Sequence, residues 1–287
     1  MTHFQCCSFG KEAWAILSDI ERSIKTKVES VGVPLKDWDV EIYRGVLTGY
    51  NDAFIISSEK RNEILSNCAD DDERERTSAI IRPILRGRDI ARYKYNWANL
   101  WLINTHNGIK GGLERIHIED YPAIKQHLDS YWDKIMPRAD QGDTPYNLRN
   151  CAYVDEFSKP KIIWKRVGSI LRFSYDENGL FGLDSTCFAV GKEIAYICCL
   201  LNSSMGHYLL NGAPRTGTGD LLISVQAVEP IKIPTISPEL NETFKTIIHK
   251  KLFNPDASIE EEVDNLIFNL YGLSEEEKEY LVTNFRG

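Results

Sequence analysis

The side chains best suited to contact a nucleic acid are concentrated between Ile80 and Asn104. This stretch has a local charge of +4 in a chain of net charge -8, because Asp89 is its one acid beside Arg82, Arg86, Arg88, Arg92 and Lys94. Guanidinium groups donate in pairs to phosphate oxygens or to the O6/N7 edge of guanine, and the interleaved Tyr and Trp rings offer stacking surfaces. A solvated strand-turn-strand whose arginines pair with carboxylates elsewhere is an equally open interpretation.

A second cationic segment, Ser158 to Arg172, holds five cations and no acid. It contains an apolar strand, Ile162–Trp164, and the flanking cations expected to anchor phosphates are Lys161, Lys165 and Arg166. Acid is segregated at the other end, since residues 235–287 contain eleven Asp and Glu against five Lys and Arg. A DNA backbone responds to the local field rather than to the net charge, so the acidic total does not exclude DNA as a partner.

Three loops add polar groups that could reach a nucleic acid. A turn-rich loop holds Arg138, Asn147 and Arg149, and a glycine-rich loop holds Arg215. The turn at residues 48–51 lies between two strand-like patterns, and Gly49 is free to take a positive φ there. We expect it to present Thr48 and Asn51 outward, where hydroxyl, amide and backbone groups hold phosphates or read adenine, although most such turns only reverse the chain.

Length and composition bound the fold. The chain has 287 residues, 43% hydrophobic and 26% charged, which is ordinary for one large or two smaller globular domains. Seven cysteines without CxxC spacing predict neither a disulfide framework nor a zinc site. An apolar run of about 20 residues, as a membrane span requires, is missing, as is a basic and apolar leader. These features predict a cytoplasmic protein.

Hydrophobic periodicity predicts a mixed α+β fold in three parts. Residues 1–37 are expected to form a helical connector, with its helix over Lys11–Ser30, and residues 38–234 a mixed domain. That domain contains a helix over Tyr121–Met136, strands over Ile162–Trp164, Ser169–Tyr175 and Ser185–Val190, and a helix over Ile194–Leu210. Residues 235–287 are expected to form a module of three helices, the last two capped by Ser258 with Glu261 and by Ser274 with Glu277.

These segments, taken in order, resemble the TaqI-like C-terminal specificity domain of bifunctional type IIG restriction-modification enzymes. The resemblance covers nearly the whole chain and rests on GVLTGYNDAFII (Gly45–Ile56), IIRPILRGRDIARY (Ile80–Tyr93), WLIN (Trp101–Asn104), YPAIKQHL (Tyr121–Leu128), FSKPKIIW (Phe157–Trp164), CCLLNSSM (Cys198–Met205), IKIP (Ile231–Pro234) and IEEEVDNLIFNLYGLSEEE (Ile259–Glu277).

The resemblance implies a sequence-specific double-stranded DNA recognition domain attached to an adenine methyltransferase and a nuclease. The chain lacks an NPPY motif, a glycine-rich AdoMet loop and a PD…(D/E)xK arrangement, so we expect it to select DNA and not to catalyse. AdoMet and Mg²⁺ are then expected only in the other domains of the full enzyme. Motifs shared by proteins that read different sequences are best assigned to scaffold or phosphate contacts. Base reading is therefore assigned above all to Arg138, Asn147, Arg149 and Arg215.

Three alternatives stay open. Arg86 and Arg88 either read bases or brace the fold through a buried ion pair with Asp89. The whole chain could instead be a docking or regulatory module for a DNA methyltransferase that reads no bases. An autonomous nuclease built on Asp140 and Asp143 would cut DNA with Mg²⁺ by itself, but the sequence offers it no convergent metal site.

Overall fold

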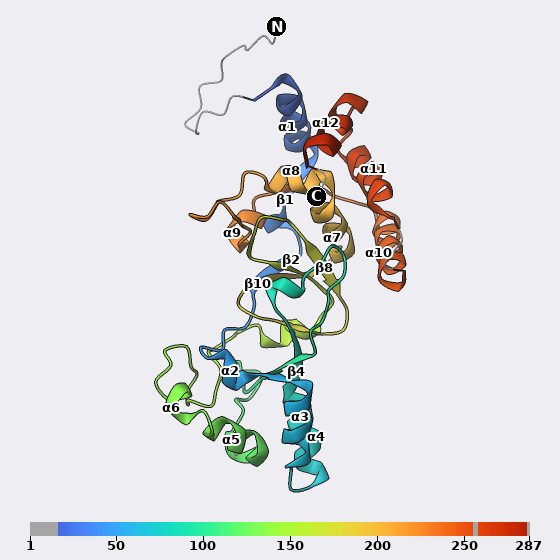
Figure 1. Cartoon of the computed structure of the whole chain (residues 1–287). Helices are drawn as coiled ribbons and strands as arrows, with labels where there is room; N and C mark the ends of the chain where they lie inside the picture. Colours follow the sequence, from blue (N-terminus) through green and yellow to red (C-terminus); the bar gives the residue numbers. More distant parts are fainter. Residues whose placement is uncertain (1–16, 255–257, 286–287) are drawn as a thin grey trace.

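One antiparallel sheet lies in the middle of the molecule and separates two hydrophobic cores (Figure 1). The computed structural model describes residues 17–254 and 258–285. The central sheet has the strand order β2-β10-β6-β8, formed by Val40–Arg44, Thr186–Gly191, Lys161–Lys165 and Phe173–Asp176. Helices and sheets alternate along the chain, which confirms the mixed α+β class.

The two inner strands of the central sheet are buried on both faces, and their side chains alternate between the two cores. Ile162 and Trp164 of β6 point into one core, whereas Ile163 points into the other. The register pairs Phe188 of β10 with Ile163, so side chains of one parity meet on each face. We call the core beneath the terminal helices the upper core and the other the lower core, following Figure 1.

The upper core is covered by helices from both ends of the described chain. They are α1 (Asp19–Val31), α7 (Ile194–Asn202), α8 (Ser204–Leu210), α10 (Pro238–Phe253), α11 (Glu260–Leu270) and α12 (Glu275–Phe285). Strand β1 (Gly32–Pro34) pairs with β12 (Lys232–Pro234), and α1 packs against α12. Two smaller elements, the β7–β11 ribbon (Val167–Gly168 with Leu221–Leu222) and α9 (Val225–Val228), lie beside this core. The segments expected as an N-terminal connector and a C-terminal module thus share one core with the sheet.

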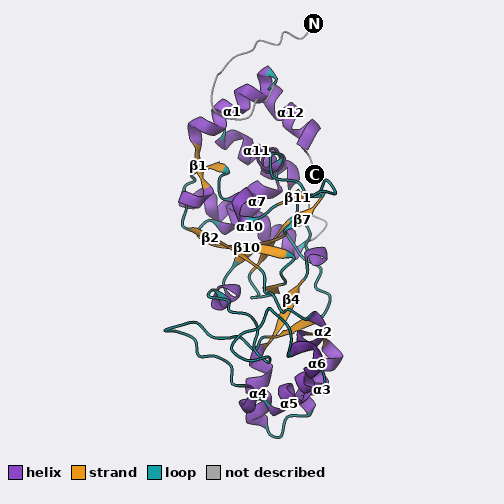
Figure 2. Cartoon of the chain, turned by 90° about the vertical axis from the view of Figure 1, so that its left-hand side faces the viewer, coloured by secondary structure: helices purple, strands orange, loops and turns teal. Residues whose placement is uncertain are grey.

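The lower core is built around a second sheet of order β3-β5-β4-β9, with strands Ile55–Ser57, Leu100–Ile103, Ile81–Leu85 and Phe181–Gly182. Its helices are α2 (Asn51–Phe54), α3 (Ser58–Ser66), α4 (Asp71–Ile80), α5 (Pro122–Asp129) and α6 (Trp132–Ile135). Strands β4 and β5 are antiparallel neighbours, and residues 86–99 connect them with a longer segment than the turn of the strand-turn-strand interpretation. Figure 2 shows that this half consists largely of loops beside its helices.

Several expected elements differ from those observed. The first helix begins at Asp19, and residues 11–16 of the expected helix lie outside the described residues. The two strands around Gly49 do not form a hairpin, because β2 and β3 belong to different sheets. The helix expected over 194–210 is broken at Ser203, whose hydroxyl caps α8 by accepting from the Gly206 amide at 3.1 Å.

The two capping expectations had different outcomes. Ser274 and Glu277 form the expected box, because the Ser274 amide donates to Glu277 Oε2 at 2.6 Å and the Glu277 amide donates to Ser274 Oγ at 3.4 Å. The Ser258 cap was wrong: α11 starts at Glu260, and the Glu260 carboxylate accepts from the Ile259 amide at 3.0 Å. Within residues 17–254 and 258–285 we find no helix long and apolar enough to cross a membrane.

Candidate nucleic-acid interface

Arg86 is a brace of the fold, as one of its two interpretations predicted. Its Nε and NH2 atoms donate to the two carboxylate oxygens of Asp89 at 3.0 and 2.7 Å, and its backbone amide donates to the same carboxylate at 2.8 Å. Asp89 is buried, so this fork neutralises a charge that would otherwise be costly inside the protein. The same hydrogen bonds raise the pKa of Arg86. Base reading by Arg86 would break this arrangement, so its assignment to DNA is withdrawn.

Lys161 was expected to anchor phosphate, and that expectation was wrong. The side chain is fully buried and its Nζ donates to Asp176 Oδ2 at 2.5 Å and to the Phe157 carbonyl at 2.7 Å. Burial lowers the pKa of Lys161, and the pairing with Asp176 opposes that effect. Lys161 starts β6 with its ammonium turned inward, whereas Lys165 ends the same strand in solvent. One strand therefore holds a structural lysine and an available one.

Arg138 was assigned to base reading, and its burial contradicts this. The guanidinium donates to four backbone carbonyls, those of Thr48, Asp140, Pro145 and Asn147, the last two from NH2. It also lies 4.4 Å from the centroid of the Phe54 ring. Desolvation lowers its pKa to about 10. A planar group with five donors satisfies several loop carbonyls at once, which explains an arginine at a buried position.

Asn147 and Thr48 also belong to this buried scaffold, contrary to the prediction. The Asn147 amide donates to the carbonyl of Ile116 at 2.9 Å and is buried. Thr48 is turned inward and donates from its hydroxyl to Asn51 Oδ1 at 2.6 Å. Of the two polar side chains expected to point outward from this turn, only that of Asn51 is exposed. Asn51 is the first residue of α2. The loops were correctly identified as polar, but their amides and hydroxyls hold the loops together.

Gly49 takes the positive φ expected of it, +70°. A Cβ at this position would lie 2.7 Å from the Asp140 carbonyl oxygen, so the turn also needs glycine for space. The backbone around Gly49 was expected to anchor phosphate. The close approach of residue 140 shows that this turn packs against the loop that carries Arg138.

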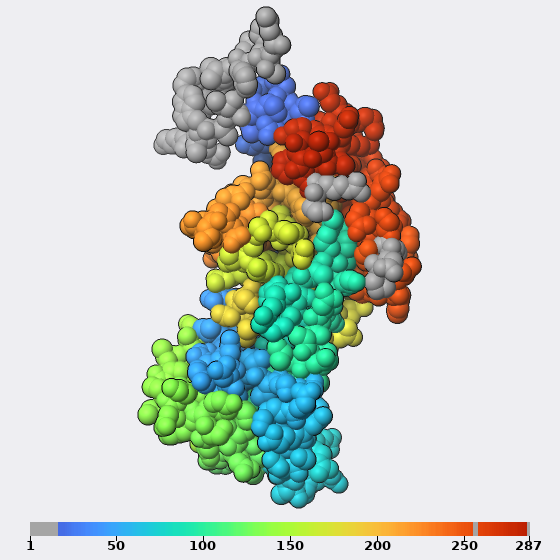
Figure 3. Space-filling model, viewed as in Figure 1, coloured from blue at the N-terminus to red at the C-terminus, as the bar shows by residue number. Residues whose placement is uncertain are grey.

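Five cations remain exposed or half-exposed on neighbouring segments, and we call the surface that they form the cationic face: Arg88, Lys165, Arg166, Arg172 and Arg215. Arg88 follows Gly87, where a Cβ would lie 2.9 Å from Lys165 Cγ. The Lys165 ammonium in turn lies near Gly168 of β7, and β7 pairs with β11. Arg215 is bridged to Leu221 of β11. Figure 3 shows these three segments, in teal, yellow-green and orange, meeting on one side of the molecule.

The cations of this face differ in how far they are engaged. Among the described residues, no ion pair or side-chain hydrogen bond is found for Arg88, Lys165 or Arg172. Arg166 is half-buried and has a buried Nε without a partner in the described part of the chain. Arg215 donates to the Gly219 carbonyl at 3.0 Å and is otherwise exposed. Arg172 was not singled out from the sequence, although it ends the cationic segment that was.

Arg149 lies in the loops of the lower half and not on the cationic face. Its NH1 contacts Asp140 Oδ1 at 2.9 Å, and the side chain is 60% exposed. Nearby loops enclose a hollow of about 450 Å³ lined by Asn107, Lys110, Arg115 and Asn150 among others. Asp143 pairs there with Arg115 at 3.0 Å, so both carboxylates once considered for a nuclease have an arginine partner. Residues 104–115 are rich in glycine, and no residue pattern in the sequence separates the polar side chains of this stretch from ordinary loop residues.

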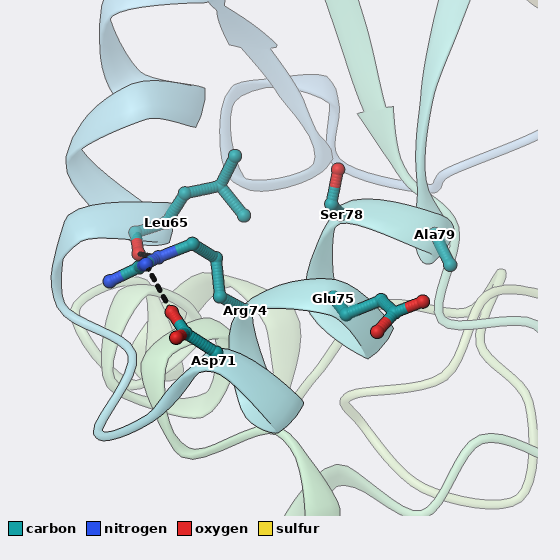
Figure 4. Close-up of a pocket in the computed structure, with 6 residues that line it drawn as sticks. All are labelled: Leu65, Asp71, Arg74, Glu75, Ser78 and Ala79. Carbon is teal, nitrogen blue, oxygen red and sulfur yellow. Dashed lines mark hydrogen bonds and ion pairs between the residues drawn. The ribbon is translucent and has the colours of Figure 1, made fainter.

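A second hollow of about 480 Å³ lies between α3 and α4. Figure 4 shows Arg74 crossing it to Asp71, an ion pair of 2.6 Å, and Arg74 Nε also donates to the Leu65 carbonyl at 3.2 Å. These side chains satisfy one another. In residues 17–254 and 258–285 we find no group of three or more His, Cys, Asp or Glu side chains placed to hold a metal ion.

Comparison with known proteins finds a matching family model, a curated relative and solved structures of similar fold. The family model of the TaqI-like C-terminal specificity domain matches residues 82–222. The type II methyltransferase M.MjaIV of Methanocaldococcus jannaschii is 22% identical over 222 residues, which is 73% of this chain and 70% of that protein.

Two solved structures share the fold. The type IIL restriction-modification enzyme MmeI, solved in complex with DNA, superposes with a TM-score of 0.61 at 11% identity over 89% of this chain. The type IIG restriction endonuclease BpuSI superposes with a TM-score of 0.58 at 14% identity over 94% of this chain. The matched region makes up 36% of the MmeI chain and 33% of the BpuSI chain. This chain therefore spans about a third of each enzyme.

Proposed function

Because residues 82–222 form a TaqI-like C-terminal specificity domain, we propose that this chain recognises a specific sequence in double-stranded DNA. It would direct the methylation and cleavage of that DNA by other domains of a restriction-modification enzyme. The finer assignment is to a type IIG enzyme that methylates adenine. AdoMet and Mg²⁺ would be bound by those other domains, and the chain would act in the cytoplasm, where bacterial or archaeal DNA lies.

The observation that carries this proposal is the set of unengaged cations on the cationic face. Arg88, Lys165 and Arg172 lie on neighbouring segments, and among the described residues none of them has an ion pair that would compete with a phosphate. Neighbouring phosphates would supply the missing partners and release counterions on binding. We assign Arg215 to a base edge, because it is exposed on a glycine-rich loop that is bridged to β11 of this face.

The corrected set of DNA-binding residues is therefore divided by proposed role. Arg88, Lys165 and Arg166 are proposed to anchor phosphates, and Arg215 is proposed to read bases. Arg149 and Asn51 are exposed on the lower half and stay as candidates for a second contact region. Exposure supports the assignments other than that of the half-buried Arg166, because a side chain that already satisfies the interior cannot also reach a groove.

The experiment is selection of randomised duplexes by the full 287-residue chain at two salt concentrations, followed by sequencing of the bound DNA. We expect a short enriched motif and an affinity that falls steeply with salt. If no motif is enriched at either salt concentration, even after a partner methyltransferase is added, the result would contradict sequence recognition and favour the docking module.

Paired variants separate the cationic face from general surface charge. We expect Lys165→Ala to weaken binding of all sequences and to reduce the slope of log K against log salt by about 1. Lys245→Ala is the matched control, because Lys245 is a half-exposed lysine of α10 whose Nζ is paired with Glu242 at 2.6 Å. Equal losses in the two variants would show that binding does not use this face.

A further inference from the structure

An exposed aliphatic side chain, Ile170, lies in the chain segment that supplies three cations of the cationic face. It is 54% exposed, although it is flanked in the same segment by Lys165, Arg166 and Arg172. The next residue, Leu171, is buried in the upper core, so the loop between β7 and β8 is fixed at that point. Figure 3 shows the yellow-green part of the chain at the surface between the teal and orange parts.

The loop is held from its other end as well. The Ile223 amide donates to the Arg166 carbonyl at 2.8 Å, and β7 pairs with β11 directly before Ile170. The Arg166 amide donates to the Ser185 carbonyl at 2.9 Å. Ile170 is therefore displayed by an anchored loop. The large exposed apolar side chains of the described residues are Val31, Leu113, Trp132, Met136, Ile170 and Phe253, and of these Ile170 is the one that lies in the segment supplying the three cations.

An aliphatic group gains nothing from a phosphate. If the surrounding cations rest on the backbone of a duplex, Ile170 projects between phosphates, where a groove presents base edges. The apolar group of a base edge is the C5-methyl of thymine in the major groove, and 5-methylcytosine presents the same group. Burial of one such methyl against an aliphatic side chain removes apolar surface of both partners from water.

We propose that Ile170 reads the C5-methyl of a pyrimidine in the DNA sequence that the chain recognises. The inference rests on the proposed function, and it adds a contact of a different kind from the charged ones. The cations fix the position of the duplex on the face. Ile170 then distinguishes a methylated pyrimidine edge from one without the methyl.

The test uses the duplex selected from the random pool and the full-length chain. Each thymine is replaced singly by uracil, which removes the methyl and nothing else, and each cytosine singly by 5-methylcytosine. For the unmodified chain we expect one uracil replacement to weaken binding about fourfold, the equivalent of burying one methyl group. In the Ile170→Ala variant that replacement should have no effect on affinity, because the side chain that contacts the methyl is absent.

The control variant is Phe253→Ala, since Phe253 is 89% exposed at the end of α10. It should keep the full methyl dependence, as should Ile170→Val. If one 5-methylcytosine strengthens binding, and Ile170→Ala abolishes that gain, the methyl belongs to methylcytosine and the proposal holds.

Two results overturn the inference while the proposed function stands. One is an enriched motif in which no single methyl affects affinity. The other is a methyl dependence of the same size in Ile170→Ala. If no motif is enriched at all, the proposed function and the inference fail together, so the two failures are distinguishable.

Discussion

At the scale of single residues, the identity of a cation does not reveal its role. Arg86 and Arg88 are two residues apart, yet Arg86 donates to a buried carboxylate and Arg88 lies in solvent. The sequence offered both interpretations for both residues, because Asp89 is within reach of either. What separates them is the path of the turn, which places the Asp89 carboxylate over the Arg86 amide at 2.8 Å. That geometry depends on the packing of Gly87 against Lys165 and Ser185.

This difference predicts opposite effects of the two alanine variants. Arg86→Ala leaves Asp89 buried without its fork, and we expect a loss of about 2 kcal/mol in the free energy of unfolding, less than for a fully buried pair because the Arg86 side chain is partly exposed. Arg88→Ala should leave stability within about 0.5 kcal/mol of the parent. Urea denaturation of the two variants and the parent measures both quantities.

The same two variants should also differ in their affinity for DNA. Arg88→Ala should weaken DNA binding at full stability, whereas Arg86→Ala, where it is folded, should bind nearly as the parent does. A folded Arg86→Ala protein with a selective loss of DNA affinity would restore Arg86 to the interface. The same holds for Arg138, Asn147 and Lys161, because each has a buried polar side chain that forms hydrogen bonds inside the protein.

At the scale of elements, local signals predicted what depends on local structure. The Ser274–Glu277 box and the positive φ of Gly49 both follow from contacts within a few residues. The strands at 162–164 and 185–190 were also placed within a few residues of β6 and β10. The sequence could not predict that the buried Ile259 would precede α11 without a side-chain cap, or that Ser203 would end one helix and cap the next, because tertiary packing decides these points.

Glu277 links two elements that are distant in the sequence, and its ionisation should matter for stability. Its carboxylate accepts from Ser23 Oγ, from Lys27 Nζ and from the Ser274 amide, each at 2.6 Å. Burial alone would raise the pKa of Glu277, but these donors outweigh it and lower the pKa to about 2 from its usual 4.5. A carboxyl with a depressed pKa in the folded state stabilises the fold above its unfolded pKa, and this contribution is lost as the pH falls from about 4.5 to about 2.

We therefore expect Glu277→Gln to lower the free energy of unfolding by about 2 kcal/mol at pH 7, after allowance for the solvent screening of Lys27. The difference between variant and parent should shrink as the pH falls through that window. Urea denaturation between pH 3 and pH 7 measures it. A difference that is independent of pH would mean that the carboxylate charge does not hold α1 to α12.

At the scale of the whole molecule, the pairing of strands was beyond the reach of sequence patterns. Strand β2 pairs with β10, and β4 pairs with β9, across long stretches of intervening chain. A period of two identifies a strand but does not name its neighbour. The result is a sheet whose two faces close separate cores, with the cationic face at the ends of its strands. Because Lys165 and the Arg88 turn both depend on that sheet, the candidate interface is a property of the assembled molecule.

The shared sheet predicts that the two cores unfold together. Phe188 is fully buried in the lower core, 4.3 Å from the Phe157 ring centroid, while its neighbour Ala189 faces the upper core. We expect Phe188→Ala to cost about 3–5 kcal/mol. If the sheet transmits this loss, hydrogen exchange under native conditions should accelerate by the same factor in the slowest amides of α5 and of α7, on opposite sides of the sheet. Phe253→Ala, on the surface, should change neither. Acceleration confined to α5 would show instead that the two cores are independent units, and that the cationic face could stay folded when the lower half opens.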